Sequence, residues 1–554
     1  MMIMKKIKDL LSPKSIKERN ISPIFAAGVV WMILGFAYCI WYYIVYGKMG
    51  IFSDLSAEMV MADLLNKEHR IVTDSWYYPT EVHVFQHAFL LQIGLLFFPH
   101  NWPAARVFAT IICLVLFGAG YFYLAKGIGM KEYAPWGAGF LFWPFSPLWL
   151  NWTLEYGYNL IFPLFTVGII TNYRSELGRV KKIIMIAAGC ILGLVSGLNG
   201  PKLLFNFYIP CVGAFLLCLV ISAGESDADN LKSYIKKNTQ DIMRALLSII
   251  FIVSDLVGYL INSRVLSAKY VFVNYAEDTV WLEERYHSFD ELLDSFLRVF
   301  GYIPGEQVVS FEGIASLLGL LLGVIVVMCI IWCAASMRKV GKEERPLVLI
   351  CFIGFVFCFI VFCYIKGYCD WYWILQYPFF ITAFLILVKN TNKKVAAVNL
   401  LVLIVFGISV SIMSVNTVRW RVDYDSGLGT YDQVEAAEYL ESENIKYGIS
   451  MAWSAQKIEE LTSGNVEMYV VDSYKYAFLP SIWLQKKSHL TPPPSDEKCA
   501  VVIANLECYS NPWELDVVKY GDYEYEKMFG TIHVYVYDSY DRIAEAFERA
   551  NAER

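Results

Sequence analysis

The sequence has few charged residues, no Gly-rich phosphate-binding loop and no internal repeat. Charged residues make up 18% of its 554 positions, whereas hydrophobic residues make up 57% and the mean hydropathy is +0.45. Soluble globular proteins of this length are less apolar, so the composition excludes that class. Because the sequence has no Gly-rich phosphate-binding motif, it lacks the usual signature of a P-loop nucleotide site.

The apolar residues are gathered in runs of about 17–25 residues, the length of a helix that crosses a bilayer. Twelve runs can be counted, and the doubtful one is 84–98, which has 15 residues and contains His87 and Gln92. If that run does not cross, the later basic loops all lie on the same side as the basic leader, residues 1–23. The positive-inside rule makes that side cytoplasmic.

We therefore predict an all-α polytopic membrane bundle of about 11 transmembrane helices, with 84–98 as a helix along the membrane surface. The predicted spans are 24–46, 104–125, 134–150, 158–171, 183–198, 203–223, 245–261, 314–337, 347–365, 371–388 and 395–413. The transmembrane module then covers 24–419, with a first external loop at 47–103 and a large external loop at 262–311. This topology predicts a plasma-membrane protein with its C-terminal end outside the cytoplasm.

The segment 420–554 differs from the rest in charge. It has 12 Lys and Arg against 24 Asp and Glu, a net charge of −12, whereas the remainder carries +6. Strand-like runs at 447–451, 466–472, 500–507 and 533–538 alternate with helical segments at 430–443, 456–461 and 541–550. We predict a small extracytoplasmic α/β domain. It has no basic patch with interleaved aromatic residues, so a nucleic-acid partner is not expected.

Thirteen cysteines are present, and 11 of them lie in or beside apolar runs. None forms a metal-type cluster with histidine. Cys499 and Cys508 bracket an apolar run that, as a strand, would hold them roughly 30 Å apart. We predict two free thiols there, because a disulfide cannot span that distance.

The large external loop contains the sequence SFDELLDSFLRVFGY. Ser288 and Glu291 have the spacing of a capping box. Phe289, Leu292 and Phe296 recur at helical spacing. We predict an amphipathic helix lying on the bilayer surface or against the bundle.

Several sequence features together resemble the GT-C superfamily of integral-membrane glycosyltransferases, such as protein O-mannosyltransferases and lipid A aminoarabinose transferases. They are an acidic residue early in the first external loop (Asp54 in FSDLSAE), the segment WYYPTEVHVFQHAFLLQIGLLFFP and the span PAARVFATIICLVLF. A span ending in SPLWLNW and a large loop after the seventh span follow. The resemblance covers 24–413 in layout and is specific over 51–159.

The resemblance implies an inverting enzyme whose sugar donor is a polyprenyl phosphate and whose acceptor is an extracytoplasmic glycan, lipid or protein. Such a reaction needs a carboxylate as general base and a cation at the departing phosphate. Asp54 is the predicted base. The family often has a second acid directly after it, where this sequence has Leu55, and Glu58 is a partial substitute. Alternatively, Ser53 and Asp54 only cap a helix, which would lower the carboxyl pKa.

Further site residues are predicted from the same comparison and from their positions. The second external loop of the family commonly carries an acid; Asn159 aligns with it here, and Glu155 is the nearest acid and a second catalytic candidate. Lys202 and Arg264 are the candidates for binding donor phosphate. The candidates for binding sugar or acceptor are Glu58, Trp76, Tyr78, Glu81 and His83.

No cofactor is expected, and the sequence does not indicate a divalent metal, although the reaction class permits one. His83 and His87 are four residues apart, and on one helix they could bind a metal, but a third ligand is not evident. Two other functions stay open. One is a non-enzymatic transporter or flippase of lipid-linked glycans, and the other is a glycan polymerase or ligase.

Overall fold

The structure is a computed structural model, and it describes most of the chain. The described residues are 22–78, 82, 84–154, 156–225, 233, 235, 237–270, 285–365, 369–391, 396–427, 430–474, 477–504 and 514–553. The predicted cytoplasmic leader therefore lies almost wholly outside the described residues.

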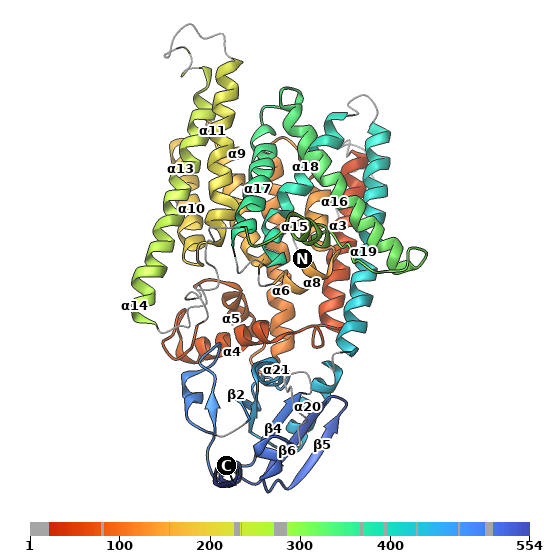
Figure 1. Cartoon of the computed structure of the whole chain (residues 1–554). Helices are drawn as coiled ribbons and strands as arrows, with labels where there is room; N and C mark the ends of the chain where they lie inside the picture. The colour runs from red at the N-terminus through yellow and green to blue at the C-terminus, as the bar shows by residue number, and fades with distance from the viewer. Residues whose placement is uncertain are drawn as a thin grey trace, which may run out of the picture.

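Within these residues, nine helical segments are long and apolar enough to cross a membrane, so the chain is a multi-pass membrane protein. They contain α3 (Pro23–Val45), α6 (Trp102–Gly127), α10 (Arg179–Gly197), η2 (Leu204–Tyr208) with α11 (Ile209–Gly224), and α13 (Thr239–Leu260) with η3 (Ile261–Leu266) and α14 (Ser267–Lys269). The others contain α16 (Phe311–Ala335), α17 (Arg345–Tyr364), η6 (Asp370–Gln376) with α18 (Tyr377–Thr391), and α19 (Ala396–Gly427). Figure 1 shows them as one bundle.

The other two predicted spans are shorter and interrupted. The run 134–150 forms α7 (Ala134–Phe142) and α8 (Pro147–Trp152), and 158–171 forms η1 (Gly157–Leu160) and α9 (Ile161–Asn172). Pro144 lies between α7 and α8, where its ring and missing N–H do not permit a continuous helix. Helix α7 packs along α3, and α9 packs along α6. Both short helices are therefore part of the bundle.

The doubtful run 84–98 forms α5 (His87–Phe97), which has 11 residues. A helix of this length is about 17 Å long and cannot cross the hydrocarbon core. It packs against α6 and against α4 (Ser53–Glu68). Both α4 and α5 lie between the bundle and the C-terminal domain (Figure 1). The first external loop thus forms a helical layer at that boundary.

The predicted amphipathic helix is α15 (Phe289–Val299), and the capping box between Ser288 and Glu291 is present. Its buried face points into the bundle, because the Phe296 ring packs against Phe355 of α17 and Trp373 of η6 at centroid distances of 5.2 and 5.3 Å. Helix α15 therefore lies against the bundle.

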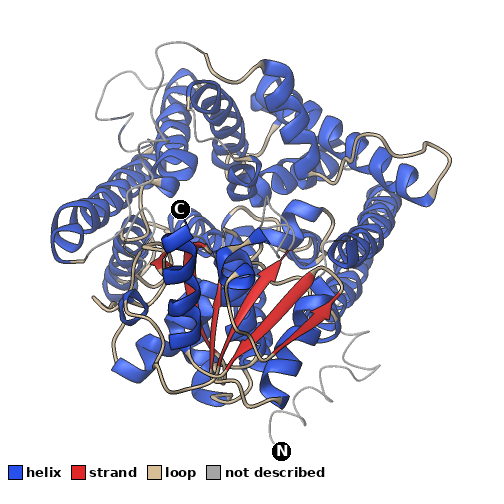
Figure 2. Ribbon diagram, turned by 60° about the horizontal axis from the view of Figure 1, so that its bottom comes forward, coloured by secondary structure: helices blue, strands red, loops and turns tan. Residues whose placement is uncertain are grey.

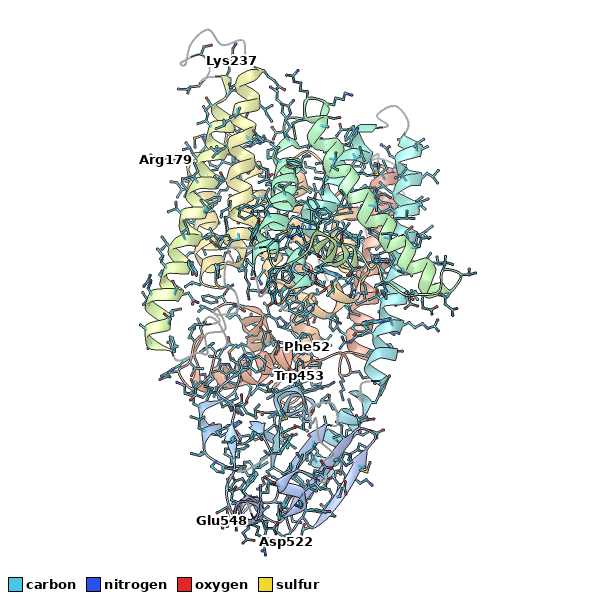
Figure 3. The ribbon with its side chains drawn as sticks, in the orientation of Figure 1. Phe52, Arg179, Lys237, Trp453, Asp522 and Glu548 are labelled. Atoms are coloured by element: carbon cyan, nitrogen blue, oxygen red, sulfur yellow. The ribbon has the colours of Figure 1, made fainter. Side chains whose placement is uncertain are left out.

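Arginine residues from a loop, from α13 and from α17 are ion-paired at the end of the bundle opposite the C-terminal domain. Arg174 and Arg244 both pair with Glu343, and Arg345 pairs with Glu225 at 2.8 Å. In Figure 3, Lys237 marks this end, whereas Asp522 and Glu548 mark the far end of the C-terminal domain. Arginine and glutamate side chains from separate elements are therefore paired at this end, and the predicted orientation of the chain stays a prediction.

The C-terminal domain contains a six-stranded sheet in the order β3-β2-β1-β4-β6-β5. Its strands are β1 (Tyr447–Ser450), β2 (Glu467–Ser473), β3 (Leu479–Pro480), β4 (Cys499–Ala504), β5 (Tyr525–Phe529) and β6 (Ile532–Tyr537). Strand β1 is parallel to β2 and β4, whereas β6 is antiparallel to β4 and β5. The α/β class is as predicted.

Helices cover both faces of the sheet (Figure 2). Helices α20 (Thr430–Ser442) and α21 (Ala452–Leu461) pack on one face, and α23 (Tyr540–Glu553) packs on the other. Of the two cysteines in the domain, Cys499 is a buried free thiol, as predicted. Cys508 lies outside the described residues.

Candidate active site

Asp54 lies in the first turn of α4, and the residue at the N-cap position is Phe52. No described side chain accepts a hydrogen bond at this N-cap. The Ser53 hydroxyl instead donates to Asp54 Oδ1 at 3.3 Å. The simple capping interpretation of Ser53 and Asp54 is therefore not what the structure has. The Asp54 carboxyl remains available for another role.

The surroundings of Asp54 make its carboxyl a weaker acid than usual. Burial raises the pKa of Asp54 from 3.8 to about 6, the Ser53 hydrogen bond opposes this shift, and the nearby Glu58 carboxyl adds to it. In the described part of the chain, no Lys or Arg forms an ion pair with Asp54. A carboxylate with a raised pKa is a stronger base that is still ionised at neutral pH, which suits proton abstraction.

A group of half-buried aromatic residues extends from the start of α4 across the bundle. This aromatic cluster comprises Phe52, Trp152, Tyr156, Trp371 and Tyr372. Phe52 packs on Trp152 with ring centroids 4.7 Å apart, and Trp152 stacks on Trp371 at 4.2 Å. Tyr156 contacts Trp371 at 5.9 Å and Tyr372 at 6.0 Å. These ring contacts connect the start of α4 with α8, the start of η1 and the start of η6.

Lys202 lies at the other end of the aromatic cluster. Its Nζ is 5.0 Å from the centroid of the Tyr156 ring, which is the geometry of a cation–π contact. The side chain is half-buried and lies just before η2. Ring contacts therefore link Phe52, which lies two residues before the predicted base, to one of the predicted phosphate ligands.

Two of the predicted sugar-binding residues are held in the protein core. Trp76 and Tyr78 are 1% and 0% exposed. The backbone of Trp76 forms a β-bridge with Lys486 of the C-terminal domain, and the Tyr78 hydroxyl accepts a hydrogen bond from the Thr73 N–H at 3.1 Å. Neither ring offers a face to a ligand, because both faces are covered by protein. Both side chains are enclosed by protein in this conformation, and their role in binding sugar or acceptor stays a prediction.

Glu58 is also buried, and its carboxylate contacts His87 Nδ1 at 2.6 Å. This contact joins α4 to the first residue of α5, so it fixes the two helices of the boundary layer to each other. The metal interpretation of His83 and His87 required both on one helix, but α5 begins only at His87. Within the described residues, no group of three or more His, Cys, Asp or Glu could hold a metal ion. Glu81 and His83 lie outside the described residues.

The second phosphate candidate, Arg264, is exposed in η3. The neighbouring Asn262 donates one hydrogen bond to the Val82 carbonyl and one to the Leu198 carbonyl, both at 2.7 Å. The first bond ties η3 to the first external loop, and the second ties it to the end of α10. Among the described residues, no ring contact joins Arg264 to the aromatic cluster.

The overall structure is similar to that of ArnT, the lipid A aminoarabinose transferase, from Cupriavidus metallidurans. The match to ArnT bound to undecaprenyl phosphate has a TM-score of 0.52 and 11% sequence identity, and it covers 92% of this chain and 98% of that chain. The apo state of ArnT matches with a TM-score of 0.50, the same identity and the same coverage. The chain has a GT-C fold.

An oligosaccharyltransferase from Archaeoglobus fulgidus also matches, with a TM-score of 0.40 and 12% identity over 86% of this chain and 69% of that chain. No protein-family model and no curated protein sequence matches the chain.

The predicted second catalytic acid is not placed by the structure. Glu155 lies outside the described residues. Its neighbour Leu154 packs against Ile51 and Leu55 at the start of α4, and Asn159 is half-buried in η1. The sequence comparison did not find the aromatic cluster, because its members come from positions as far apart as 52 and 372. The one sequence signal for this cluster was the presence of a Trp or Tyr in each predicted external turn.

Proposed function

We propose that the protein is an inverting glycosyltransferase that moves a sugar from a polyprenyl-phosphate donor to an extracytoplasmic glycan, lipid or protein. The observations that support this most are the raised carboxyl pKa of Asp54, which lies two residues after Phe52 of the aromatic cluster, and the contact of Lys202 with Tyr156 of the same cluster. The fold shared with ArnT supports this reaction class by analogy. ArnT of the same fold was crystallised bound to undecaprenyl phosphate.

In the proposed reaction, an acceptor hydroxyl attacks the anomeric carbon from the face opposite the phosphate. The bond from that carbon to the phosphate oxygen breaks, and the polyprenyl phosphate leaves with the electron pair. Asp54 accepts the proton of the hydroxyl as the new glycosidic bond forms. Because one displacement occurs, the configuration at the anomeric carbon inverts.

The proposed role of Lys202 is to stabilise the phosphate, which gains negative charge as the bond breaks. Tyr156 holds the ammonium by its ring face. The half-buried rings of Trp152 and Trp371 provide the apolar surface that lines most small-molecule sites. Arg264 is proposed as a second phosphate ligand. Because its side chain is exposed, it would have to move toward the donor phosphate on binding.

The proposal includes an orientation in the plasma membrane. The end with the Arg174, Arg244 and Arg345 ion pairs faces the cytoplasm, and the C-terminal domain, residues 420–554, lies outside. Residues 24–419 form the membrane module and 1–23 the cytoplasmic leader. Asp54 then faces the side on which a flipped lipid-linked donor is found.

The experiment is a donor-consumption assay with membranes that contain the full chain and a radiolabelled polyprenyl-phosphate hexose. We expect label to leave the donor pool and enter a pool of different mobility. Vesicle flux of label without donor consumption would contradict the proposal and support a transporter. Addition of glycan units one after another, or of a preformed chain, would indicate a polymerase or ligase.

Replacing Lys202 tests the phosphate contact. Loss of one charge-assisted hydrogen bond costs about 1.5–3 kcal/mol, so Lys202→Met is expected to raise the KM for the donor by about 10- to 100-fold. Lys202→Arg should keep most of the affinity. The matched control is Lys269→Met, because Lys269 makes a similar contact with Tyr270 at 5.1 Å but is exposed and away from the aromatic cluster. Equal effects at Lys202 and Lys269 would contradict the assignment.

A further inference from the structure

Helix α21 of the C-terminal domain carries three charged side chains that are almost fully buried. Lys457, Glu459 and Glu460 are 3%, 2% and 0% exposed. Buried charges of this kind are rare unless they are paired. The helix lies between the sheet and α4 (Figure 1), and it contacts α4 and α6 directly. Its partners therefore include the membrane module.

One guanidinium joins three elements at this interface. Arg106 of α6 donates from Nε to Glu460 Oε1 at 2.6 Å and from Nη2 to Glu460 Oε2 at 2.7 Å. The same Nη2 donates to the Leu55 carbonyl at 2.8 Å. Leu55 directly follows Asp54 in the first turn of α4. Arg106 thus links α21 and α6 to the backbone beside the proposed base.

A second buried charge holds the segment that enters α4. Lys457 donates from Nζ to the Met49 carbonyl at 3.2 Å. The interface continues next to Arg106, where the Trp102 N–H donates to Ser463 Oγ at 3.1 Å. In Figure 3, Phe52 and Trp453 both lie at this boundary between the bundle and the C-terminal domain. The chain is therefore fixed on both sides of Asp54.

The C-terminal domain is also attached at a second place, through backbone bonds. The Tyr77 N–H donates to the Gln485 carbonyl at 2.9 Å, and the Lys487 N–H donates to the Ser75 carbonyl at 2.8 Å. These bonds involve no part of α21. Because these backbone bonds also attach the C-terminal domain to the membrane module, the contacts at Arg106 are not the sole means of holding the domain in place.

We infer that Arg106 and Glu460 are positioning residues, which fix the first turn of α4 and thereby the location of the Asp54 carboxylate. The inference rests on the proposed function. A guanidinium suits this task because its planar fork can serve a carboxylate with two parallel N–H groups and still reach a carbonyl. The C-terminal domain then contributes to catalysis without touching substrate.

The simpler alternative is that the ion pair between Arg106 and Glu460 only docks the C-terminal domain. A double variant in which the two charges are swapped distinguishes positioning from docking. Arg106→Glu/Glu460→Arg restores opposite charges, but a carboxylate at position 106 cannot donate to the Leu55 carbonyl. Positioning predicts a near-normal melting temperature, a kcat lowered by about tenfold or more and a donor KM within about twofold of wild type. Docking alone predicts a normal kcat.

Arg106→Lys provides a second test if the double variant Arg106→Glu/Glu460→Arg does not fold. An ammonium keeps the charge but lacks the fork, so it cannot keep all three bonds, and kcat should again fall while KM is kept. The matched control is Glu497→Gln, because Glu497 pairs with Lys446 at 3.2 Å in the same domain but on its exposed surface. This control should leave both constants unchanged.

Hydrogen–deuterium exchange of the full chain gives a readout that does not depend on turnover. Both Arg106 variants should exchange faster than wild type at residues 53–60, whereas the 75–77 attachment should be unchanged. The inference would be overturned if hydrogen–deuterium exchange at residues 53–60 were unaltered in the Arg106 variants. A wild-type kcat in Arg106→Glu/Glu460→Arg would also overturn it. If the wild-type protein consumes no donor, the proposed function fails, and the exchange data alone decide whether Arg106 and Glu460 position α4.

Discussion

Asp54→Asn is expected to lower the rate of sugar transfer by about 100- to 10,000-fold, the usual contribution of a general base. The amide has nearly the size of the carboxylate and can still accept the Ser53 hydrogen bond, but it cannot take a proton from the acceptor. The affinity for donor should change little, because Lys202 and not Asp54 is proposed to hold the phosphate. The measurement is kcat at saturating radiolabelled polyprenyl-phosphate hexose.

The control for this variant is Asp63→Asn on the same helix. Asp63 forms an ion pair with the largely exposed Lys67 at 2.8 Å, in the C-terminal half of α4 and beyond its first turn. Such surface pairs contribute about 0–1 kcal/mol, so activity and stability should stay near wild type. A similar loss of activity in both variants would mean that any change of charge on α4 impairs the protein, and that Asp54 has no special role.

The second large effect is expected for Arg106→Met. Methionine fills the volume but leaves the Glu460 carboxylate buried without its partner, and an unpaired buried charge costs about 3–5 kcal/mol. The destabilisation should appear as a lower melting temperature and as faster proteolysis at the boundary between the C-terminal domain and α4. The double variant Arg106→Met/Glu460→Leu should recover most of this stability, because it removes both charges.

The comparison for that measurement is Lys446→Met, which breaks the exposed pair with Glu497. Its cost should be below about 1 kcal/mol. If Arg106→Met were no more damaging than Lys446→Met, the buried pair would contribute nothing to docking. The positioning of Asp54 by the C-terminal domain would then lose its physical basis.

Local signals in the sequence were enough to predict much of the fold. Long apolar runs predicted the nine helical segments that, within the described residues, can cross a membrane. The short run around His87 was correctly separated from them by its length and by the charge of the later loops. The capping box of α15 depends on two residues three apart, so it could also be read directly. The four apolar strands of the C-terminal domain were found because their side chains are buried.

Other elements lacked such a signal. The edge strand β5 was missed because three of its five residues are exposed and its pattern is not apolar. The interruption between α7 and α8 was missed because the run 134–150 is apolar throughout, although Pro144 marked the break. In both cases the hydrophobic pattern indicates which residues are buried. It does not indicate which backbone groups form the hydrogen bonds of a strand or of a continuous helix.

The candidate site shows a similar division. Asp54 was found through the family resemblance, but its raised carboxyl pKa depends on burial that the sequence does not reveal. Trp76 and Tyr78 were chosen as aromatic residues in an external loop, and the fold places them in the core. Contacts between distant positions, such as Arg106 with Glu460, have no local pattern from which they could be predicted.

The most direct test of the central claim is the pH dependence of kcat/KM for donor consumption by wild-type protein and Asp54→Asn. The general base must be deprotonated, so a carboxyl pKa raised to about 6 predicts that activity increases tenfold per pH unit below pH 6 and is constant above it. The residual activity of Asp54→Asn should lack this acid limb. An unchanged rate and the same acid limb in Asp54→Asn would contradict the account.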